Sequence, residues 1–552
     1  MAPRPITRRT LLAAAFAAQP TPLFEEVPGA ISGIRWVHDN ARSARRYLPE
    51  SLGPGVAFVD FDNDGWPDIF LVNSGPSDFY NPRQPLRHAL YRNNRDGTFT
   101  DVTAKAGIAP PSSFGMGIAA ADYENSGFPG FFITAYGQST LYRNNRNGTF
   151  TDVTAKSGIE APPWSTSALW FDYNGDGLLD LFVCGFVDYT EKSQALCIAE
   201  RGGRPGYCMP RIFRPTACKL FRNNGNGTFT DVSQAAGIAA RPSKALGAVT
   251  TDFNNDGLLD LFVANDTVEN FLFVQRGARF EDQAIGAMVA FGESGWARSG
   301  MGVDSADING DGWQDLLVAN IDKERFSLYR NTHHGVFDDL SFAGEIGRAT
   351  YNLSGWGCKF FDADNDGELD LLLANGHPDD MVSERNPKVT WAEPMLFFQP
   401  DGGMLRNRSA TAGPVFQKQL AARGLAAGDY NNDGRLDFVV GVNGGAPLLI
   451  KNNAGGGNHW AGVRLKGTSA NRDGIGAFIT WSAGSRRRSR LKTSGGSYLS
   501  SHDSRDILGL GQNHKCDWVE IRWPKPSKRV ERFDGVPTGR YSVLEEGQGS
   551  VV

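Results

Sequence analysis

A nine-residue pattern recurs along the chain and constrains its fold more than any other feature. Six copies read Asp-x-Asp/Asn-x-Asp-Gly-x-x-Asp, and each lies between two short apolar stretches. Asp, Asn and Gly form tight turns and the apolar stretches are typical of strands, so each copy predicts a loop between two β-strands. The intact copies are loop one (60–68), loop three (172–180), loop four (252–260), loop five (307–315), loop six (362–370) and loop seven (429–437). Loop two (122–130, DYENSGFPG) keeps the frame but lacks carboxylates at two positions.

The intact loops have the composition of a site for a hard cation. Four oxygen side chains within nine residues, turned by a glycine, suit calcium, which takes six to eight oxygen ligands. We predict that side chains at positions one, three, five and nine bind the ion together with the carbonyl at position seven, which gives about six Ca²⁺ sites. Loop two should fold alike and bind an ion weakly or not at all. The predicted ligands are Asp60, Asp62, Asp64, Trp66 and Asp68; Asp172, Asn174, Asp176, Leu178 and Asp180; Asp252, Asn254, Asp256, Leu258 and Asp260; Asp307, Asn309, Asp311, Trp313 and Asp315; Asp362, Asp364, Asp366, Glu368 and Asp370; and Asp429, Asn431, Asp433, Arg435 and Asp437.

The loops allow two other interpretations. An EF-hand opens in the same way but needs a bidentate Glu at position twelve and helical flanks. Position twelve is apolar in all six intact loops, as at Leu71 and Val183, so the EF-hand is excluded. Plain polar turns remain an alternative, but six copies in register favour metal binding. We expect the calcium to be mainly structural, since it binds only the folded state.

A second hairpin signature follows the loops and completes the repeat. It reads LYRNNRDGTFTDVT from Leu90, LYRNNRNGTFTDVT from Leu141 and LFRNNGNGTFTDVS from Leu220. Two hairpins per repeat make four antiparallel strands, which is one propeller blade. The sequence therefore predicts an all-β fold, with a seven-bladed β-propeller over residues 19–456. The last repeat lacks its fourth strand, and residues 24–27 match the missing one, so the N-terminal segment should close the ring.

From residue 457 onward the pattern changes. Alternating apolar and polar residues bounded by Gly, Asn and Pro predict a small β domain over 457–552. This part carries 16 Lys and Arg against 9 Asp and Glu, although the whole chain has a net charge of −5. Its run RRRSRLK (486–492) could bind an acidic glycan, nucleic acid or a membrane surface, but we favour the charged face of an edge strand. Nucleic acid is not an expected partner of the protein.

The N-terminus indicates export. Thr7-Arg8-Arg9 followed by a short apolar run predicts an export signal over 1–18, which resembles the twin-arginine type. No later segment approaches 18 apolar residues, so we expect a mature protein without a transmembrane segment in the periplasm or outside the cell. In that setting disulfides form. Cys197, Cys208 and Cys218 share one insertion and should contain at least one bridge, with Cys184 as a further candidate partner.

Together these residues resemble the cartilage acidic protein family, in which an FG-GAP or VCBS-type repeat propeller (integrin-α-like repeats) precedes an ASPIC/UnbV domain. The resemblance extends from YLPESLGPGVAFVDFDNDG, through YRNNRDGTFTDVTAKAGI and ANGH, to RSRLKTSGGSYLSSHDSRDILGLG. It implies an exported calcium-binding propeller protein of the bacterial type, whose members are mostly of undefined role. Loop two departs from the repeat pattern, which puts full calcium stoichiometry in doubt.

The repeat geometry also places a candidate binding face. If the calcium loops join the first and second strands, then the long insertions 73–89, 188–218 and 377–394 emerge on the opposite face, where we expect a protein or polysaccharide ligand. The blade-entry loops there carry Glu50, Trp164, Lys244, Arg298 and Asn352.

The sequence contains no phosphate loop, nucleophile elbow or compact His/Cys set, so no catalytic residue is assigned, and His377 is only a weak candidate. A binding or adhesion module is favoured. The alternative is a calcium-dependent hydrolase or cyclase that uses the central pocket of the ring.

Overall fold

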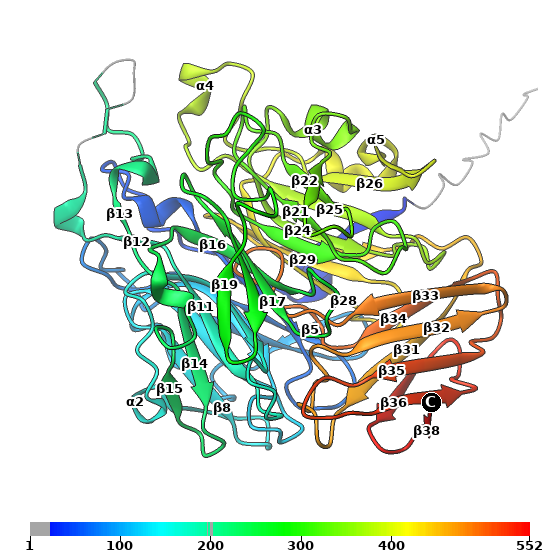
Figure 1. Ribbon diagram of the computed structural model, residues 1–552. Helices are drawn as coiled ribbons and strands as arrows, with labels where there is room; N and C mark the ends of the chain where they lie inside the picture. Colours follow the sequence, from blue (N-terminus) through cyan, green and yellow to red (C-terminus); the bar gives the residue numbers. More distant parts are fainter. Residues whose placement is uncertain (1–21, 196, 199–202) are drawn as a thin grey trace, which may run out of the picture.

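The computed structural model describes residues 22–195, 197–198 and 203–552, so the predicted export signal lies outside the described residues. Seven four-stranded antiparallel sheets form the larger part of the molecule, and the C-terminal strands form two further sheets beside them (Figure 1). Each four-stranded sheet is one blade, and none of the sheets closes on itself. The predicted all-β, seven-bladed propeller is therefore confirmed.

Blades one to six use four strands in chain order. Blade one is β2 (Val56–Val59), β3 (Asp68–Leu71), β4 (Ala89–Asn93) and β5 (Phe99–Asp101); blade two is β6 (Phe114–Ala121), β7 (Gly130–Tyr136), β8 (Thr140–Asn144) and β9 (Phe150–Asp152). Blade three is β10 (Ser165–Phe171), β11 (Asp180–Gly185), β14 (Lys219–Asn223) and β15 (Phe229–Asp231); blade four is β16 (Ala245–Thr251), β17 (Asp260–Asn265), β18 (Phe271–Arg276) and β19 (Arg279–Asp282). Blade five is β20 (Val303–Ala306), β21 (Asp315–Val318), β22 (Ser327–Asn331) and β23 (Phe337–Asp339); blade six is β24 (Gly355–Phe361), β25 (Asp370–Asn375), β26 (Leu396–Asp401) and β27 (Met404–Asn407).

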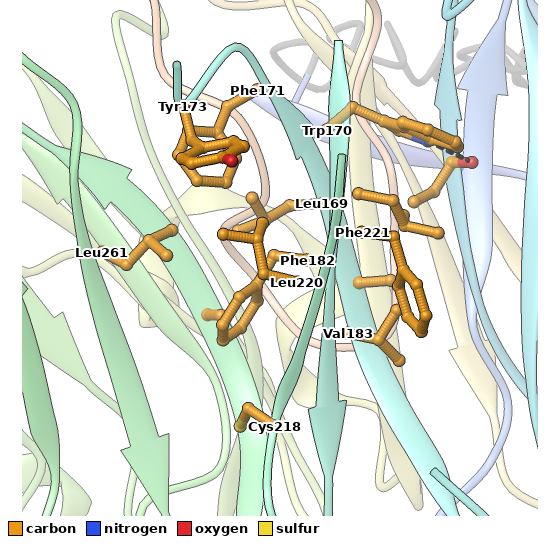
Figure 2. Close-up of a cluster of buried hydrophobic side chains, with 14 of the residues drawn as sticks. Leu169, Trp170, Phe171, Tyr173, Phe182, Val183, Cys218, Leu220, Phe221 and Leu261 are labelled. Carbon is orange, nitrogen blue, oxygen red and sulfur yellow. Dashed lines mark hydrogen bonds between the residues drawn. The ribbon is translucent and has the colours of Figure 1, made fainter. Parts of the chain in front are cut away.

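The blades are apolar on both faces because each packs between two neighbours. Every residue of β10 and β11 is buried. Figure 2 shows Trp170 and Phe171, adjacent on β10, pointing to opposite faces of blade three. Such alternation buries both faces of a strand and explains why the second strands appear in the sequence as continuous apolar runs.

The N-terminal strand closes the ring as predicted. Blade seven consists of β28 (Ala422–Gly428), β29 (Asp437–Val442), β30 (Leu448–Asn452) and, at its outer edge, β1 (Phe24–Val27). β1 pairs antiparallel with β30, with Phe24 opposite Asn452. The fully buried Phe24 ring also lies 4.9 Å from the ring of Phe397 in blade six. The first strands of the seven blades contact one another in sequence, and β28 returns to β2.

The C-terminal strands, which we call the C-terminal unit, form two packed sheets. One sheet contains β31 (His459–Lys466), β34 (Asp506–Gly511) and β37 (Tyr541–Glu545). The other contains β32 (Phe478–Ala483), β33 (Arg486–Leu491), β35 (Trp518–Arg522), β36 (Val530–Asp534) and β38 (Ser550–Val551). Between them lies a separate apolar core that includes Val463, Trp481 and Ile521.

The segment 494–503 leaves the C-terminal unit and enters the centre of the propeller; we call it the plug. Its backbone or side chains bond to the first strand of every blade. For example, Phe58 N–H donates to Ser501 O at 3.1 Å, Ile118 N–H to Leu499 O at 3.0 Å and Val303 N–H to Ser497 O at 3.1 Å. The further bonds in blades three, four, six and seven involve Ser167, Thr250, Cys358 and Ala427.

The opposite end of the ring is closed by the segment before blade one. The turn η1 (Leu48–Ser51) is fully buried, and Leu48 and Leu52 share one apolar cluster with Tyr498 and Leu499 of the plug. Tyr498 donates its hydroxyl to Leu52 O at 3.2 Å. Side chains from both ends of the chain thus fill the centre of the ring.

Helical turns and short strands occupy the connections. They are α1 (Gly29–Ser32), α2 (Thr154–Ser157), α3 (Glu345–Thr350), α4 (Val382–Arg385), α5 (Ser409–Ala412), η2 (Glu191–Ser193), η3 (Pro210–Ile212), η4 (Ile238–Ala240), η5 (Pro414–Gln417), β12 (Val187–Asp188) and β13 (Arg214–Pro215). Among the described residues, no helix is long and apolar enough to cross a membrane. Cys197 and Cys208 form a disulfide, which confirms a bridge within the insertion, whereas Cys184 and Cys218 are buried free thiols.

Candidate metal centre

The seven loops sit between the first and second strands of their blades and share one backbone shape. In loop one, Asp60 accepts N–H bonds from Asp64 at 2.9 Å and from Gly65 at 3.0 Å. Position four has a left-handed conformation, with φ of 57° at Asn63, and position six repeats it with 85° at Gly65. The sequence reasoning noted only the glycine at position six. Asn or Gly at position four meets the same backbone requirement because these residues tolerate positive φ.

The carboxylates converge most closely in loops one and six. Oxygens of Asp60, Asp62 and Asp68 lie within 4.8 Å of one another, as do those of Asp362, Asp364 and Asp366. In loops three, four, five and seven, position three is Asn and its amide donates to the Asp at position five; the bonds are Asn174 to Asp176 at 2.8 Å, Asn254 to Asp256 at 2.8 Å, Asn309 to Asp311 at 2.7 Å and Asn431 to Asp433 at 2.9 Å.

The donor set in these loops fits a hard divalent cation. One carboxylate oxygen on each of Asp62, Asp362 and Asp437 is buried without a hydrogen-bond partner among the described residues. An unpaired buried carboxylate is costly, and a bound cation offsets that cost. Residues of loops one, six and seven would therefore hold such an ion.

Burial also perturbs the titration of the position-one carboxyls. It raises the pKa of Asp60, Asp172, Asp252 and Asp429 to about 6 and that of Asp362 to about 7. The cause is desolvation, which disfavours the ionised form. Ionisation of these carboxyls in the metal-free folded protein therefore carries a free-energy cost, which a bound cation would reduce.

Position nine connects the two hairpins of a blade. Asp68 accepts N–H bonds from Phe61 at 3.2 Å and from Asn93, at the end of β4, at 2.8 Å. Asp180 makes the equivalent bonds with Tyr173 and Asn223. The carboxylate at position nine therefore has a structural role, whether or not it also binds an ion.

In blades one to five and blade seven, an amide side chain near the end of the third strand bonds to the neighbouring blade. Asn223 donates its side-chain N–H to Tyr123 O of blade two at 2.8 Å, and it is buried. The hairpin signature in the sequence contains these residues but does not indicate that they bond to a neighbouring blade. The equivalent inter-blade donors are Asn93 to Tyr430, Asn144 to Phe61, Gln275 to Tyr173, Asn331 to Phe253 and Asn452 to Ala363.

Loop two is held by the C-terminal unit. Asp473 accepts the N–H of Asp122 at 2.9 Å, and Asn125 accepts the N–H of Arg472 at 2.9 Å. The Arg472 guanidinium lies 3.7 Å from the Asp122 carboxylate. Protein groups thus compensate part of the charge of the loop that has lost two of its carboxylates.

The C-terminal unit covers most of the other loops as well. Arg505 donates to Gly65 O of loop one at 2.9 Å, and the Tyr541 hydroxyl donates to Asp429 of loop seven at 2.8 Å. Gly509 packs so closely against the carboxylate of Asp362 in loop six that any larger side chain at this position would clash with it. The candidate metal loops therefore belong to an interface between the propeller and the C-terminal unit.

The prediction that five blade-entry residues lie on an exposed binding face opposite the loops is wrong for most of them. Glu50 and Trp164 are 0% exposed and Lys244 is 3% exposed, because the segment 38–55 and described parts of the insertion, such as Tyr207 and Pro210, lie against this side of the ring. Arg298 is mostly buried, and Asn352 alone of the five is exposed.

His377, the weak catalytic candidate, is buried too. It is held by Asp322 at 3.1 Å and by the N–H of Asp379 at 2.9 Å, which indicates a structural role.

Comparison with known families fits this architecture. The FG-GAP-like repeat model matches residues 60–131, 125–183, 212–263, 252–318 and 307–373, which together span more than half of the chain. The ASPIC and UnbV model matches residues 467–551. The fold and the repeats define an FG-GAP repeat propeller protein. With its ASPIC/UnbV domain, the chain belongs to the cartilage acidic protein family.

Individual relatives are distant. Cartilage acidic protein 1 of Mus musculus is 26% identical over 380 residues, which cover 64% of this chain and 51% of that protein. The Homo sapiens protein of the same name is 24% identical over 533 residues, covering 90% and 72%. The chain thus spans about half the length of the mouse relative. A solved structure of an Agrocybe aegerita lectin that recognises non-reducing terminal N-acetylglucosamine covers 64% of this chain and 79% of its own, with a TM-score of 0.38 and 16% identity.

Proposed function

We propose that the protein is an exported, calcium-stabilised interaction module for a protein or polysaccharide. The unpartnered buried carboxylate oxygens of loops one, six and seven carry the calcium part of this proposal. Calcium would supply positive charge to loops whose carboxyls are otherwise ionised at a cost. Residues of the loops themselves fix the loop backbone, connect the two hairpins of a blade and bind the C-terminal unit.

An interaction role agrees with the family. The repeats and the ASPIC/UnbV domain are typical of interaction or adhesion modules. The Cys197–Cys208 disulfide is compatible with an oxidising compartment and supports export.

The enzyme alternative depended on a central pocket in the ring. Tyr498 and Leu499 are 0% and 1% exposed at that position, packed against Trp356 and Met301. Filling of the centre removes the cavity that a substrate would enter and favours the binding role.

The calcium part is tested by ion content. Metal-depleted protein is dialysed against calcium, and bound ions are counted by mass spectrometry for the native protein and for the variant Asp362→Asn. We expect about six ions per chain in the native protein, one for each intact loop. The variant should lose one ion. Absence of bound ions at millimolar calcium would contradict the proposal.

A further inference from the structure

A large cavity separates β33 from blades five and six. Its volume is about 1270 Å³, and it lies between the C-terminal unit and the loop side of the propeller. All six residues of β33 line one wall, while Gly367 of loop six and Met404 and Leu405 of β27 line the other. Pockets for small molecules typically measure about 300–1,000 Å³, so this cavity has room for a segment of polymer.

β33 presents a free backbone edge to this cavity. It is the last strand of its sheet, paired on one side with β32. Lys492, the residue after β33, donates its N–H to Ala477 O, the residue before β32. In an antiparallel ladder every second residue bonds to the neighbouring strand. Arg490, Arg488 and Arg486 therefore direct their backbone groups toward β32, and the backbone groups of Leu491, Ser489 and Arg487 point away from it. Within the described part of the chain, these outward groups have no hydrogen-bond partner.

The same strand carries positive charge at every second residue. Arg486 and Arg488 form no ion pair with any described carboxylate, and the closest one to Arg490 is Asp506, at 3.8 Å. Arg488 reaches across to Gly367 O at 2.7 Å. An anionic neighbour would thus be favourable along this edge.

We propose that the free edge of β33 binds an extended acidic peptide segment of a partner protein as an additional antiparallel or parallel strand. The inference rests on the proposed interaction role and names the class of partner. Side chains directly opposite on adjacent strands lie about 4.5–5.5 Å apart, so acidic residues at alternate positions of the peptide would pair with Arg486, Arg488 and Arg490. The peptide backbone would bond to the outward groups of Arg487, Ser489 and Leu491.

The free backbone edge distinguishes a peptide from an acidic polysaccharide. A polysaccharide could satisfy the arginines, but it has no regular series of amide N–H and C=O groups to continue the ladder. Binding by strand addition therefore depends on the N–H of Ser489, whereas binding by charge alone does not. This difference provides the test.

The experiment uses fluorescence anisotropy with the full chain in calcium buffer. The probe is a labelled peptide of four Glu-Thr dipeptides, compared with the same peptide N-methylated at alternate residues and with an oligogalacturonate of equal charge. The variants are Ser489→Pro, which removes one outward N–H on an edge strand where proline is tolerated, and the double variant Arg486→Ser with Arg490→Ser. Ser489→Ala and Arg487→Ser are the matched controls, because Arg487 projects from the other face of the sheet and lies 3.9 Å from Glu520.

We expect the alternating peptide to bind, and Ser489→Pro and the double arginine variant each to weaken binding by about tenfold. N-methylation should have a similar effect, and both controls should stay within about twofold. No binding of the peptide, or equal binding to Ser489→Pro and Ser489→Ala, would overturn the inference. The inference would also be overturned if the oligogalacturonate bound more tightly than the peptide and Ser489→Pro left its affinity unchanged. The proposed interaction role would then still hold. Thermal unfolding of each variant with and without calcium is measured in the same samples, and a cooperative transition shows that the variant is folded. Calcium stabilisation without peptide binding would contradict this inference alone. Loss of calcium stabilisation in the native protein would contradict the proposed function.

Discussion

The hydroxyl of Tyr541, in the C-terminal unit, donates a 2.8 Å hydrogen bond to the carboxylate of Asp429, the first residue of loop seven. Both residues are at least half-buried, and Arg505 stacks on the Tyr541 ring with 4.0 Å between the guanidinium carbon and the ring centroid. A predicted calcium ligand thus also holds the C-terminal unit on the propeller. Stability of the loops and docking of the C-terminal unit should therefore be coupled.

The plug provides a direct test of that coupling. Leu499→Ala removes a buried side chain at the centre of the ring and should lower the free energy of unfolding by about 2–5 kcal/mol. Because the plug bonds to all seven blades, propeller and C-terminal unit should still unfold in one transition. Denaturant unfolding followed by circular dichroism and by tryptophan fluorescence measures both quantities. Val543→Ala, at an exposed position of the C-terminal unit, is the control and should have little effect. Two well-separated transitions in the native protein would contradict the coupling.

The inter-blade amides predict a contrast between adjacent asparagines. Asn223→Ala leaves Tyr123 O and Leu179 O without their donor and should cost about 1–3 kcal/mol of unfolding free energy. Asn224→Ala removes only exposed bonds to Thr228 and Thr230 within one hairpin and should cost clearly less. Chemical denaturation of the two variants side by side measures the difference. Equal losses would show that the inter-blade bond is unimportant.

The raised carboxyl pKa values predict an unusual pH dependence of the metal-free protein. The folded Asp60 and Asp362 carboxyls have pKa values of about 6 and 7, against 3.8 as the ordinary value. The folded state therefore binds more protons than the unfolded chain between about pH 4 and 7, and stability falls as the pH rises through this window. Calcium competes with these protons, so its stabilising effect should grow over the same range.

Thermal unfolding at pH 5, 6, 7 and 8, with calcium and after removal of metal on a chelating resin, measures this dependence. Asp362→Asn lacks one of the titrating groups and should flatten the metal-free curve. Metal-free protein whose stability rises steadily from pH 5 to pH 8 would contradict the assigned pKa directions.

The repeat architecture was predictable because its determinants are local. Each Asp-rich loop and each Asn-Gly or Asp-Gly turn lies between apolar stretches of strand length, so blades can be counted along the sequence. Closure by β1 was predictable from the missing strand after Asn452. The bridge among Cys197, Cys208 and Cys218 followed from their shared insertion.

Other features depend on contacts between distant residues and escaped sequence reasoning. Nothing in the local pattern of SGGSYLSSHD indicates that Tyr498 and Leu499 fill the centre of a ring built from residues distributed over most of the preceding chain. Burial of Glu50 and Lys244 likewise follows from a segment and an insertion that fold over the ring. The sequence did contain a signal for the inter-blade bonds, because Asn recurs at the end of the third strand while the exposed turn residues nearby vary. That signal could not be interpreted without the structure, since the bonded carbonyl group lies on the neighbouring blade.

Thermal unfolding of the metal-free protein at pH 7.5, before and after addition of calcium, tests the central claim most directly. If calcium binds the folded loops, the midpoint should rise by several degrees and should increase with calcium concentration, since each ion binds the folded state alone. Magnesium at equal concentration should have a smaller effect because its strict octahedral geometry suits these loops less well. An unchanged midpoint at millimolar calcium, with native secondary structure in the metal-free protein, would contradict the account and leave the loops as polar turns.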